Sequence, residues 1–260
     1  MTFLDLHVPG DPLLLPNPWD AGSARLLASL GFAALATTSS GFAATLGRLD
    51  MSVTRDEALT HAAAIVAAVD VPVSADLENC FADDPAGVAD TITRAIGAGL
   101  AGCSVEDATG HPDDPIYHAA LAAERVAAAA QAAGDDIVLT ARAENFLHGR
   151  TDLADTIARL QTFQDAGAHV LYAPGLTTSE QISTVVREVE RPVNVLALPG
   201  APGVAELADL GVARISVGGA FAFAAFGALA EAAREFREQG TYGFWNEAGI
   251  GRDATRAAFS

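Results

Sequence analysis

Short apolar runs alternate with alanine-rich amphipathic stretches along most of this chain. A short apolar run bounded by turn residues is typical of a buried strand, and apolar residues at helical spacing are typical of a surface helix. We expect strands over Leu13–Leu15, Ala33–Thr37, Pro72–Leu77, Gly102–Val105, Ile137–Ala141, His169–Tyr172, Val193–Leu198 and Arg214–Val217. We expect helices over Arg55–Val69, Pro85–Gly97, Tyr117–Ala133, Asp152–Ala166 and Ser179–Glu190. Strands that alternate with helices form a parallel sheet, and about eight of them close a (β/α)₈ TIM barrel.

Several joints between a helix and the next strand carry a glycine directly after the last helical turn. Gly31, Gly99, Gly167 and Gly211 take this position, where glycine adopts the left-handed conformation that ends a helix. Their recurrence favours a barrel over an open sheet. Because no long linker interrupts the chain, we expect a single domain over residues 1–260.

Composition and charge narrow the class of protein. Half of the 260 residues are hydrophobic, which is enough for one large core. No apolar run approaches the ~18 residues of a membrane span, and no basic segment precedes an apolar run near Met1, so we expect a cytoplasmic protein without a membrane partner. The net charge of −18 excludes nucleic acid as a plausible partner, because its phosphates would repel the protein. The C-terminal tail, residues 241–260, is apolar enough to pack on a neighbouring subunit or on the outside of the barrel.

The chain contains no lysine, and all 15 basic residues are arginine. Schiff-base aldolases, pyridoxal enzymes and P-loop NTPases each need a lysine, so these three classes are excluded. Two cysteines, Cys80 and Cys103, are too few for a disulfide framework or a zinc finger. We expect both to be buried thiols, since no base lies near Cys80 in the sequence to activate it.

Acidic residues collect at the predicted strand ends, where a barrel places its active site. Asp76 and Glu78 follow the third strand at a spacing that puts both side chains on one face, and Glu106 ends the fourth strand. Acids that converge there need a cation or raised pKa values. Mg²⁺ suits oxygen ligands and keeps waters that reach further carboxylates. Two alternatives stay open, namely acids that cap helices or pair with arginines, and an acid/base pair without metal.

Two further segments are candidates for binding a substrate. Arg142, at the end of the fifth strand, shares a face with Glu144, so it serves as an ion-pair partner, as a cation that steadies an oxyanion, or as both. The segment Ser39–Phe42 either supplies backbone N–H groups and a hydroxyl to a carboxylate or is an ordinary turn.

These residues, in this order, resemble the isocitrate lyase/phosphoenolpyruvate mutase superfamily from about Leu14 to Phe244. The resemblance rests on five segments in the order of successive strands: Pro16–Ala21, Thr38–Phe42, Val71–Glu78, Val105–Asp107 and Ala141–Glu144.

The resemblance implies Mg²⁺, or Mn²⁺ in its place, held by Asp76, Glu78, Glu106 and Asp50, with Glu78 where the family usually has a second Asp. It implies that Ser40, Gly41 and Phe42 bind the carboxylate of a small 2-oxo acid, and that Arg142 faces the substrate. Arg142 and Glu106 are the expected catalytic residues. The resemblance also implies a homodimer or homotetramer in which the last helix is swapped between subunits.

The chain departs from the characterised members of this superfamily in its loops. After Asp107 it reads Ala108-Thr109-Gly110-His111, without the lyases' cysteine motif and without the lysine of the P–C enzymes. The sixth strand is followed by Ala173-Pro174-Gly175, which lacks the lyases' glutamate and the mutase's histidine. The hypothesis is a Mg²⁺-dependent lyase or hydrolase that cleaves a C–C bond in a 2-oxo acid or 2-hydroxy diacid. A P–C bond enzyme and a 2-oxo acid sensor without turnover are the alternatives.

Overall fold

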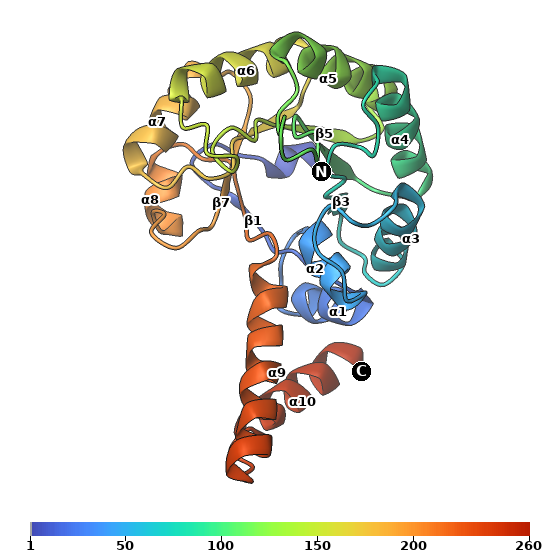
Figure 1. Ribbon diagram of the computed structural model, residues 1–260, viewed down its shortest axis with the longest axis vertical. Coiled ribbons are helices and arrows are strands. Elements are labelled where there is room, and N and C mark those ends of the chain that lie inside the picture. Colours follow the sequence, from blue (N-terminus) through green and yellow to red (C-terminus); the bar gives the residue numbers. More distant parts are fainter. Residues whose placement is uncertain (1) are drawn as a thin grey trace.

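The computed structural model describes residues 2–260 and shows eight parallel strands in a nearly closed barrel with helices around it (Figure 1). The strands are β1 (Leu13–Leu15), β2 (Leu35–Ala36), β3 (Val73–Ala75), β4 (Gly102–Glu106), β5 (Val138–Arg142), β6 (Val170–Tyr172), β7 (Val193–Leu196) and β8 (Arg214–Ser216). Their order is β1-β8-β7-β6-β5-β4-β3-β2. The Ala36 N–H group donates to the Pro16 carbonyl at 3.1 Å and joins β2 to β1. The predicted (β/α)₈ barrel is confirmed, and each of its predicted strands is present.

The helices follow the predicted alternation. They are the 3₁₀ helix η1 (Leu4–Leu6) and the α-helices α1 (Ala21–Ser29), α2 (Ser39–Thr45), α3 (Arg55–Val66), α4 (Pro85–Gly97), α5 (Ala119–Ala133), α6 (Leu153–Asp165), α7 (Ser179–Glu188), α8 (Val204–Asp209), α9 (Ala220–Gln239) and α10 (Trp245–Phe259). All five predicted helices are found, with ends that differ by a few residues. The segment Ser39–Phe42, for which an ordinary turn was one of two interpretations, opens α2.

Local sequence signals explain where these helices begin and end. Asp84 caps α4 by accepting a hydrogen bond from the Gly87 N–H group, and Pro85 occupies the first turn, where its missing N–H costs nothing. Gly99 and Gly167, at two of the predicted joints, have φ values of +80° and +104°. Glycine reaches this left-handed region without strain, so the joints between helix and strand are encoded locally.

Most of the core lies in two places. The larger part fills the ring between strands and helices and is built from residues such as Ile92, Leu139, Leu160 and Phe163, which are almost fully buried. A smaller cluster that includes Phe3 and Leu13 closes the barrel at the amino ends of the strands. The opposite end is therefore the one left open for a site.

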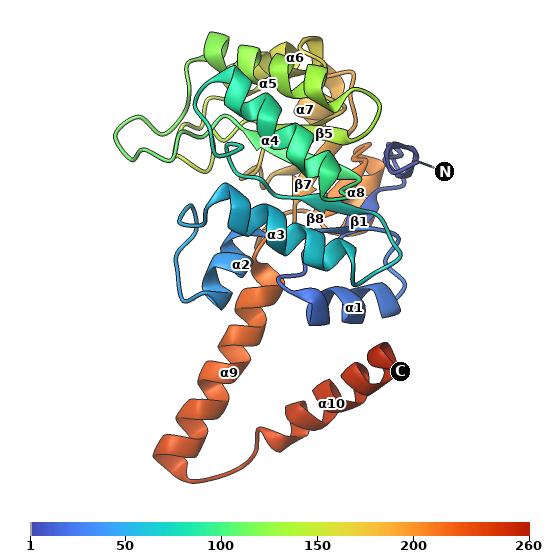
Figure 2. The same ribbon diagram turned by 90° about the vertical axis from the view of Figure 1, so that its right-hand side faces the viewer.

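The last two helices leave the barrel. Figure 2 shows α9 extending away from it and α10 turning back toward α1. The predicted tail thus contains a helix, and α10 contacts α1 of the same chain. Large apolar side chains on this pair are exposed, among them Phe223, Leu229, Phe236 and Trp245. In the part of the chain that the structure describes, no helix combines the length and the apolar character needed to cross a membrane.

We predict that Gly102→Ala destabilises the barrel. A Cβ at this position would lie 2.5 Å from Phe3 Cε1 and 3.0 Å from Ser74 Oγ, inside the closed end of the barrel. Overpacking of this kind costs about 1–3 kcal/mol of unfolding free energy. The matched control is Gly97→Ala in α4, where an added Cβ meets nothing within 4 Å and where alanine favours the helix. Urea denaturation that showed equal stability for the two variants would contradict this account.

Candidate active site

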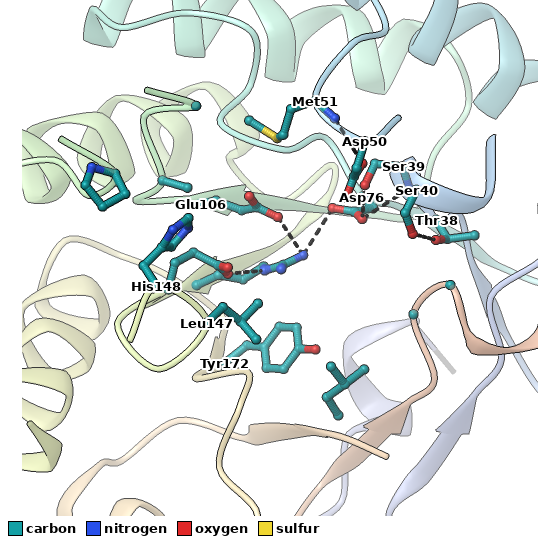
Figure 3. A pocket seen from close by; sticks show the side chains of 18 of the residues that line it. Thr38, Ser39, Ser40, Asp50, Met51, Asp76, Glu106, Leu147, His148 and Tyr172 are labelled. Atoms are coloured by element: carbon teal, nitrogen blue, oxygen red, sulfur yellow. Dashed lines mark hydrogen bonds and ion pairs between the residues drawn. The ribbon is translucent and has the colours of Figure 1, made fainter. Parts of the chain in front are cut away.

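A cavity of about 640 Å³ opens at the carboxyl ends of the strands (Figure 3). Five of the predicted site residues, Ser40, Asp50, Asp76, Glu106 and Arg142, line it. Ser40 belongs to α2 and Asp50 to the segment after it, Asp76 directly follows β3, and Glu106 and Arg142 end β4 and β5, so only the folded barrel brings them together. The position agrees with the rule that a (β/α)₈ barrel carries its site at this end.

Arg142 is at the centre of the polar side of the cavity. Its Nη1 atom contacts Asp76 Oδ1 at 3.2 Å and Glu106 Oε1 at 2.7 Å, and its Nε atom contacts Glu144 Oε1 at 2.7 Å. The sequence left two roles open for Arg142, as an ion-pair partner and as a cation that steadies an oxyanion. In the structure Arg142 pairs with carboxylates and also lines the cavity, so its position is compatible with both roles. One guanidinium cannot neutralise three carboxylates, so the site retains negative charge.

Asp76 and Glu78 lie close together, but they do not share one face of a continuous strand, as the sequence predicted. The strand β3 ends at Ala75, and Glu78 has a φ of +51°, so the alternation of a continuous strand does not apply. Asp76 lines the main cavity, whereas Glu78 is buried behind it and lines smaller cavities next to it. Burial, followed by the charges of Asp76 and Asp50, raises the pKa of Glu78 to about 8. Its Oε1 atom has no hydrogen-bond partner among residues 2–260.

Asp50 and Glu106, the two other predicted ligands, also have raised pKa values. Burial and then the charge of Asp76 raise the pKa of Asp50. Burial raises the pKa of Glu106 well above its usual range, although Arg142 opposes the shift. All these shifts have the sign expected for carboxylates that are withdrawn from water and lie close to other carboxylates.

These residues fit a hard divalent cation. Within residues 2–260 no three His, Cys, Asp or Glu side chains are arranged to enclose a metal by themselves. Mg²⁺ does not require such a cage, because it is commonly held by one or two carboxylates together with waters and substrate oxygens. The surplus of negative charge and the unpaired Glu78 Oε1 atom favour a cation beside Asp76. Asp76 would be a direct ligand from the cavity wall, with Asp50, Glu78 and Glu106 around it.

Glu106 and Asp107 point in opposite directions, as adjacent strand residues must. Glu106 reaches the cavity, whereas Asp107 is buried between β4 and α6. Asp107 Oδ2 contacts Arg159 Nη1 at 3.0 Å, and its Oδ1 accepts the Glu144 N–H group at 2.8 Å. Asp107 therefore fixes the backbone of Glu144, which in turn holds Arg142.

The segment Ser39–Phe42 presents a different set of donors from the one expected. Thr38 caps α2 by accepting the Gly41 N–H group on its Oγ1 at 3.3 Å, and the Thr38 carbonyl accepts the Phe42 N–H group at 3.0 Å. The Phe42 ring stacks on His61 with 3.8 Å between ring centroids. Ser40 lines the cavity, but Gly41 and Phe42 do not. Their predicted role in binding a substrate carboxylate gains no support from this geometry.

Several lining residues were not selected from the sequence. The ring of Tyr172 lies 4.9 Å from the Arg142 guanidinium carbon, and its position at the end of β6 was the signal that could have identified it. Leu147 and Leu196 form apolar parts of the wall. His148 is exposed and also lines the cavity. Nothing in their local sequence distinguishes these three.

Both cysteines are buried and free, as expected. Burial raises the pKa of the Cys80 thiol to about 12, so it stays protonated at neutral pH. A protonated buried thiol is a poor nucleophile.

The fold and the position of the site define the class, which is a (β/α)₈ barrel with a candidate active site at the carboxyl ends of its strands. The family model described as phosphoenolpyruvate phosphomutase matches residues 3–237. The chain therefore belongs to the isocitrate lyase/phosphoenolpyruvate mutase superfamily. Its members are Mg²⁺-dependent C–C lyases and P–C enzymes that act on small acids.

Individual proteins show the same likeness. A crystal structure of a candidate lyase/mutase from Burkholderia cenocepacia J2315 is 54% identical, has a TM-score of 0.94 and covers 98% of this chain and 93% of its own. The 2-methylisocitrate lyase of Escherichia coli is 28% identical over 73% of this chain and 70% of its own length. The structure of a phosphonopyruvate hydrolase with oxalate and Mg²⁺ has the same fold, with a TM-score of 0.80 at 23% identity over 89% of this chain and 84% of its own.

We predict that Arg159→Met strongly destabilises the protein, because it leaves the Asp107 carboxylate buried without its ion-pair partner. Breaking one half of a buried ion pair costs roughly 3–5 kcal/mol of unfolding free energy. Arg94→Met is the control, since Arg94 pairs with Asp56 and Asp90 at the surface, where an ion pair contributes about 0–1 kcal/mol. Similar denaturation midpoints for the two variants would contradict the conclusion that the buried Asp107–Arg159 ion pair stabilises the structure around Glu144.

Proposed function

We propose that this protein is a Mg²⁺-dependent lyase or hydrolase that cleaves a C–C bond in a small 2-oxo acid or 2-hydroxy diacid. The observation that carries the proposal is the sharing of Arg142 among Asp76, Glu106 and Glu144 at 2.7–3.2 Å, which leaves carboxylate charge unneutralised at the cavity wall. A bound cation would balance that charge and would supply a Lewis acid for the 2-oxo group.

The residues of the chain have separate tasks in this proposal. The Nη2 atom of Arg142 forms no hydrogen bond within residues 2–260, so it is free to steady negative charge on a substrate oxygen. Glu106 and Glu144 hold the guanidinium in place at 2.7 Å each. Leu147 and Leu196 give the substrate an apolar wall, which limits the access of water to the developing charge.

The cavity favours a C–C substrate over a phosphonate. Arg142 is the only arginine among the lining residues, and the chain has no lysine to add a second fixed cation. A phosphonate carries more negative charge than a carboxylate and generally needs several cationic partners. The P–C enzyme therefore remains the second candidate. A 2-oxo acid sensor is the third, supported by the loop after Asp107, which lacks the catalytic residues of characterised members.

We predict that Asp76→Asn abolishes both Mg²⁺ binding and turnover, because it removes the carboxylate that lines the cavity. Oxaloacetate, 2-methylisocitrate, 4-hydroxy-2-oxo acids and phosphonopyruvate are offered with Mg²⁺ and with EDTA, and release of 2-oxo acid and of phosphate is followed. We expect Mg²⁺-dependent release of a 2-oxo acid that falls by at least about a hundredfold in the variant.

The control is Asp56→Asn, an exposed surface substitution that should leave turnover unchanged. Phosphate release would establish the P–C enzyme instead. Tight oxalate binding without turnover on any substrate would establish the sensor. Product release that is equal with Mg²⁺ and with EDTA would refute the metal site.

We also propose that the chain forms a homodimer or homotetramer through α9 and α10. The exposed side chains of Leu229, Phe236, Trp245 and Ile250 are each 60% or more accessible in the single chain. Such a large apolar surface is unfavourable in water, and a second copy with the same surface would cover it. The swapped last helix of the superfamily is one way to make this contact.

We predict that the double substitution Leu229→Asp and Phe236→Asp produces a monomer. Light scattering coupled to size exclusion is the measurement, at about the micromolar concentrations where stable interfaces stay intact. The control is Val204→Asp, which places the same charge at an exposed apolar residue of α8, away from the two helices. A wild-type monomer, or an unchanged oligomer in the double variant, would disprove the proposed interface.

A further inference from the structure

A small cavity lies inside the barrel, next to the candidate active site. Its volume is about 50 Å³, and side chains from seven of the eight strands line it, so it lies on the barrel axis. Asp76, Arg142 and Tyr172 line both cavities, whereas Arg214 lines only the smaller one. The interior of a (β/α)₈ barrel is normally filled by bulky branched side chains. A polar cavity at this place therefore requires a physical reason.

Arg214, the first residue of β8, brings a buried cation to this cavity. It is 5% exposed, and none of the ion pairs within residues 2–260 includes it. Its Nε atom donates to Asn194 Oδ1 at 2.9 Å, and its Nη1 atom contacts His7 Nε2 at 3.2 Å. Its Nη2 atom donates to no group in the described part of the chain. Because the side chain lines the cavity, this atom is available to a ligand there.

Arg214 keeps its charge at neutral pH. Burial lowers the pKa of its guanidinium to about 10, with Tyr172 opposing the shift, and this value is still well above neutral. His7 brings no counter-charge, because burial lowers its pKa to about 3. A guanidinium can only donate, so His7 accepts at Nε2 and donates from Nδ1 to the Phe3 carbonyl at 3.0 Å. A buried cation without a counter-ion is strongly unfavourable, so an anion beside Nη2 would stabilise the barrel.

Three hydroxyl groups of the cavity wall have a proton that is not used elsewhere. Ser216 Oγ accepts a hydrogen bond from Asn194 Nδ2 at 3.0 Å, and Thr37 Oγ1 accepts one from the Asp76 N–H group at 3.0 Å. Ser74 Oγ forms no hydrogen bond to another residue between 2 and 260. None of the three donates to a protein group within that range. A hydroxyl in this state donates to an acceptor in the cavity.

Asp76 is the one acidic side chain among the residues that line this cavity, and its oxygens already accept hydrogen bonds. Its Oδ1 atom accepts from Arg142 Nη1 at 3.2 Å and from Ser104 Oγ at 3.3 Å. Its Oδ2 atom accepts from Ser39 Oγ at 3.0 Å. The Asp76 charge is therefore partly balanced at its own end of the cavity. The wall around Arg214 offers donors, and a set of donors around a cation favours an anion over water.

We propose that this cavity binds a monovalent, monatomic anion of the chloride class, held by Arg214 Nη2 and by the three hydroxyls of the wall. A cavity of roughly 10–15 Å³ holds one water. A volume of about 50 Å³ therefore admits such an ion with a water and excludes an organic acid. The ion neutralises Arg214 and stabilises the barrel along its axis, and it enters from the larger cavity, which shares Asp76, Arg142 and Tyr172. This site is separate from the metal and substrate sites and does not depend on the proposed function.

The test measures urea denaturation of the full chain while chloride replaces gluconate at constant ionic strength. Gluconate is too large for the cavity, so the wild-type midpoint should rise with chloride and level off as the site fills. Arg214→Met removes the cation and should abolish this dependence. Ser74→Ala removes one donor and should raise the chloride concentration of half effect about tenfold. Thr140→Val is the matched control, because the buried Thr140 hydroxyl also has no partner among residues 2–260 but does not line the cavity, so its chloride dependence should equal that of the wild type.

Bromide locates the ion directly, whether or not Arg214→Met folds. Wild-type crystals soaked in bromide should show an anomalous scattering peak beside Arg214 Nη2. A bromide-soaked crystal without a peak in this cavity would overturn the proposal, and so would a chloride dependence that persists unchanged in Arg214→Met. A peak without any effect of chloride on the midpoint would mean an adventitious ion only, and it would overturn the stabilising role.

Discussion

The structure of the site depends on one electrostatic constraint: a single buried arginine has to serve several carboxylates. Arg142 contacts Asp76, Glu106 and Glu144 within 3.2 Å, and Asp50 and Glu78 add further acidic charge nearby. Burial raises the pKa values of Glu78 and Glu106, and the charge of Asp76 adds to the raised pKa values of Asp50, Glu78 and Glu106. A cation bound beside Asp76 would balance this surplus of negative charge. It would also be accessible to an acid that enters the cavity.

The pairing of β4 with β5 places Arg142 next to one of its carboxylate partners. Glu106 of β4 and Arg142 of β5 are direct partners across the sheet, so the contact between them follows from pairing alone. Asp107, the next residue, necessarily turns outward, and there it contacts Arg159 of α6 and the backbone of Glu144. The contacts that Asp107 makes outside the barrel thus fix the segment that carries Glu144, and Glu144 in turn holds Arg142 at the cavity. Strand pairing thus fixes Glu106 and Arg142, whereas Ser40, Asp50 and Asp76 lie outside the strands.

A second constraint acts from the closed end of the barrel. Arg214 has no carboxylate partner, and its donors set the direction of hydrogen bonds through Asn194 and Ser216 toward the cavity floor. The two arginines therefore divide the interior. Arg142 organises negative charge at one wall, and Arg214 favours an anion in the barrel interior.

The sequence by itself determined the barrel, because strand and helix periodicity, helix caps such as Asp84 and glycines such as Gly99 are local signals. It also identified Asp76, Glu106 and Arg142, since residues at strand ends in a parallel barrel have to converge. It did not determine that β3 stops at Ala75 and leaves Glu78 behind the cavity, or that Thr38 occupies the N–H groups of Gly41 and Phe42. Nor did it select Tyr172 and Gly219, which line the cavity because distant segments meet there. Local structure follows from neighbouring residues, whereas the free donors and unpaired charges of a cavity depend on which segments meet there, and only the tertiary structure decided that.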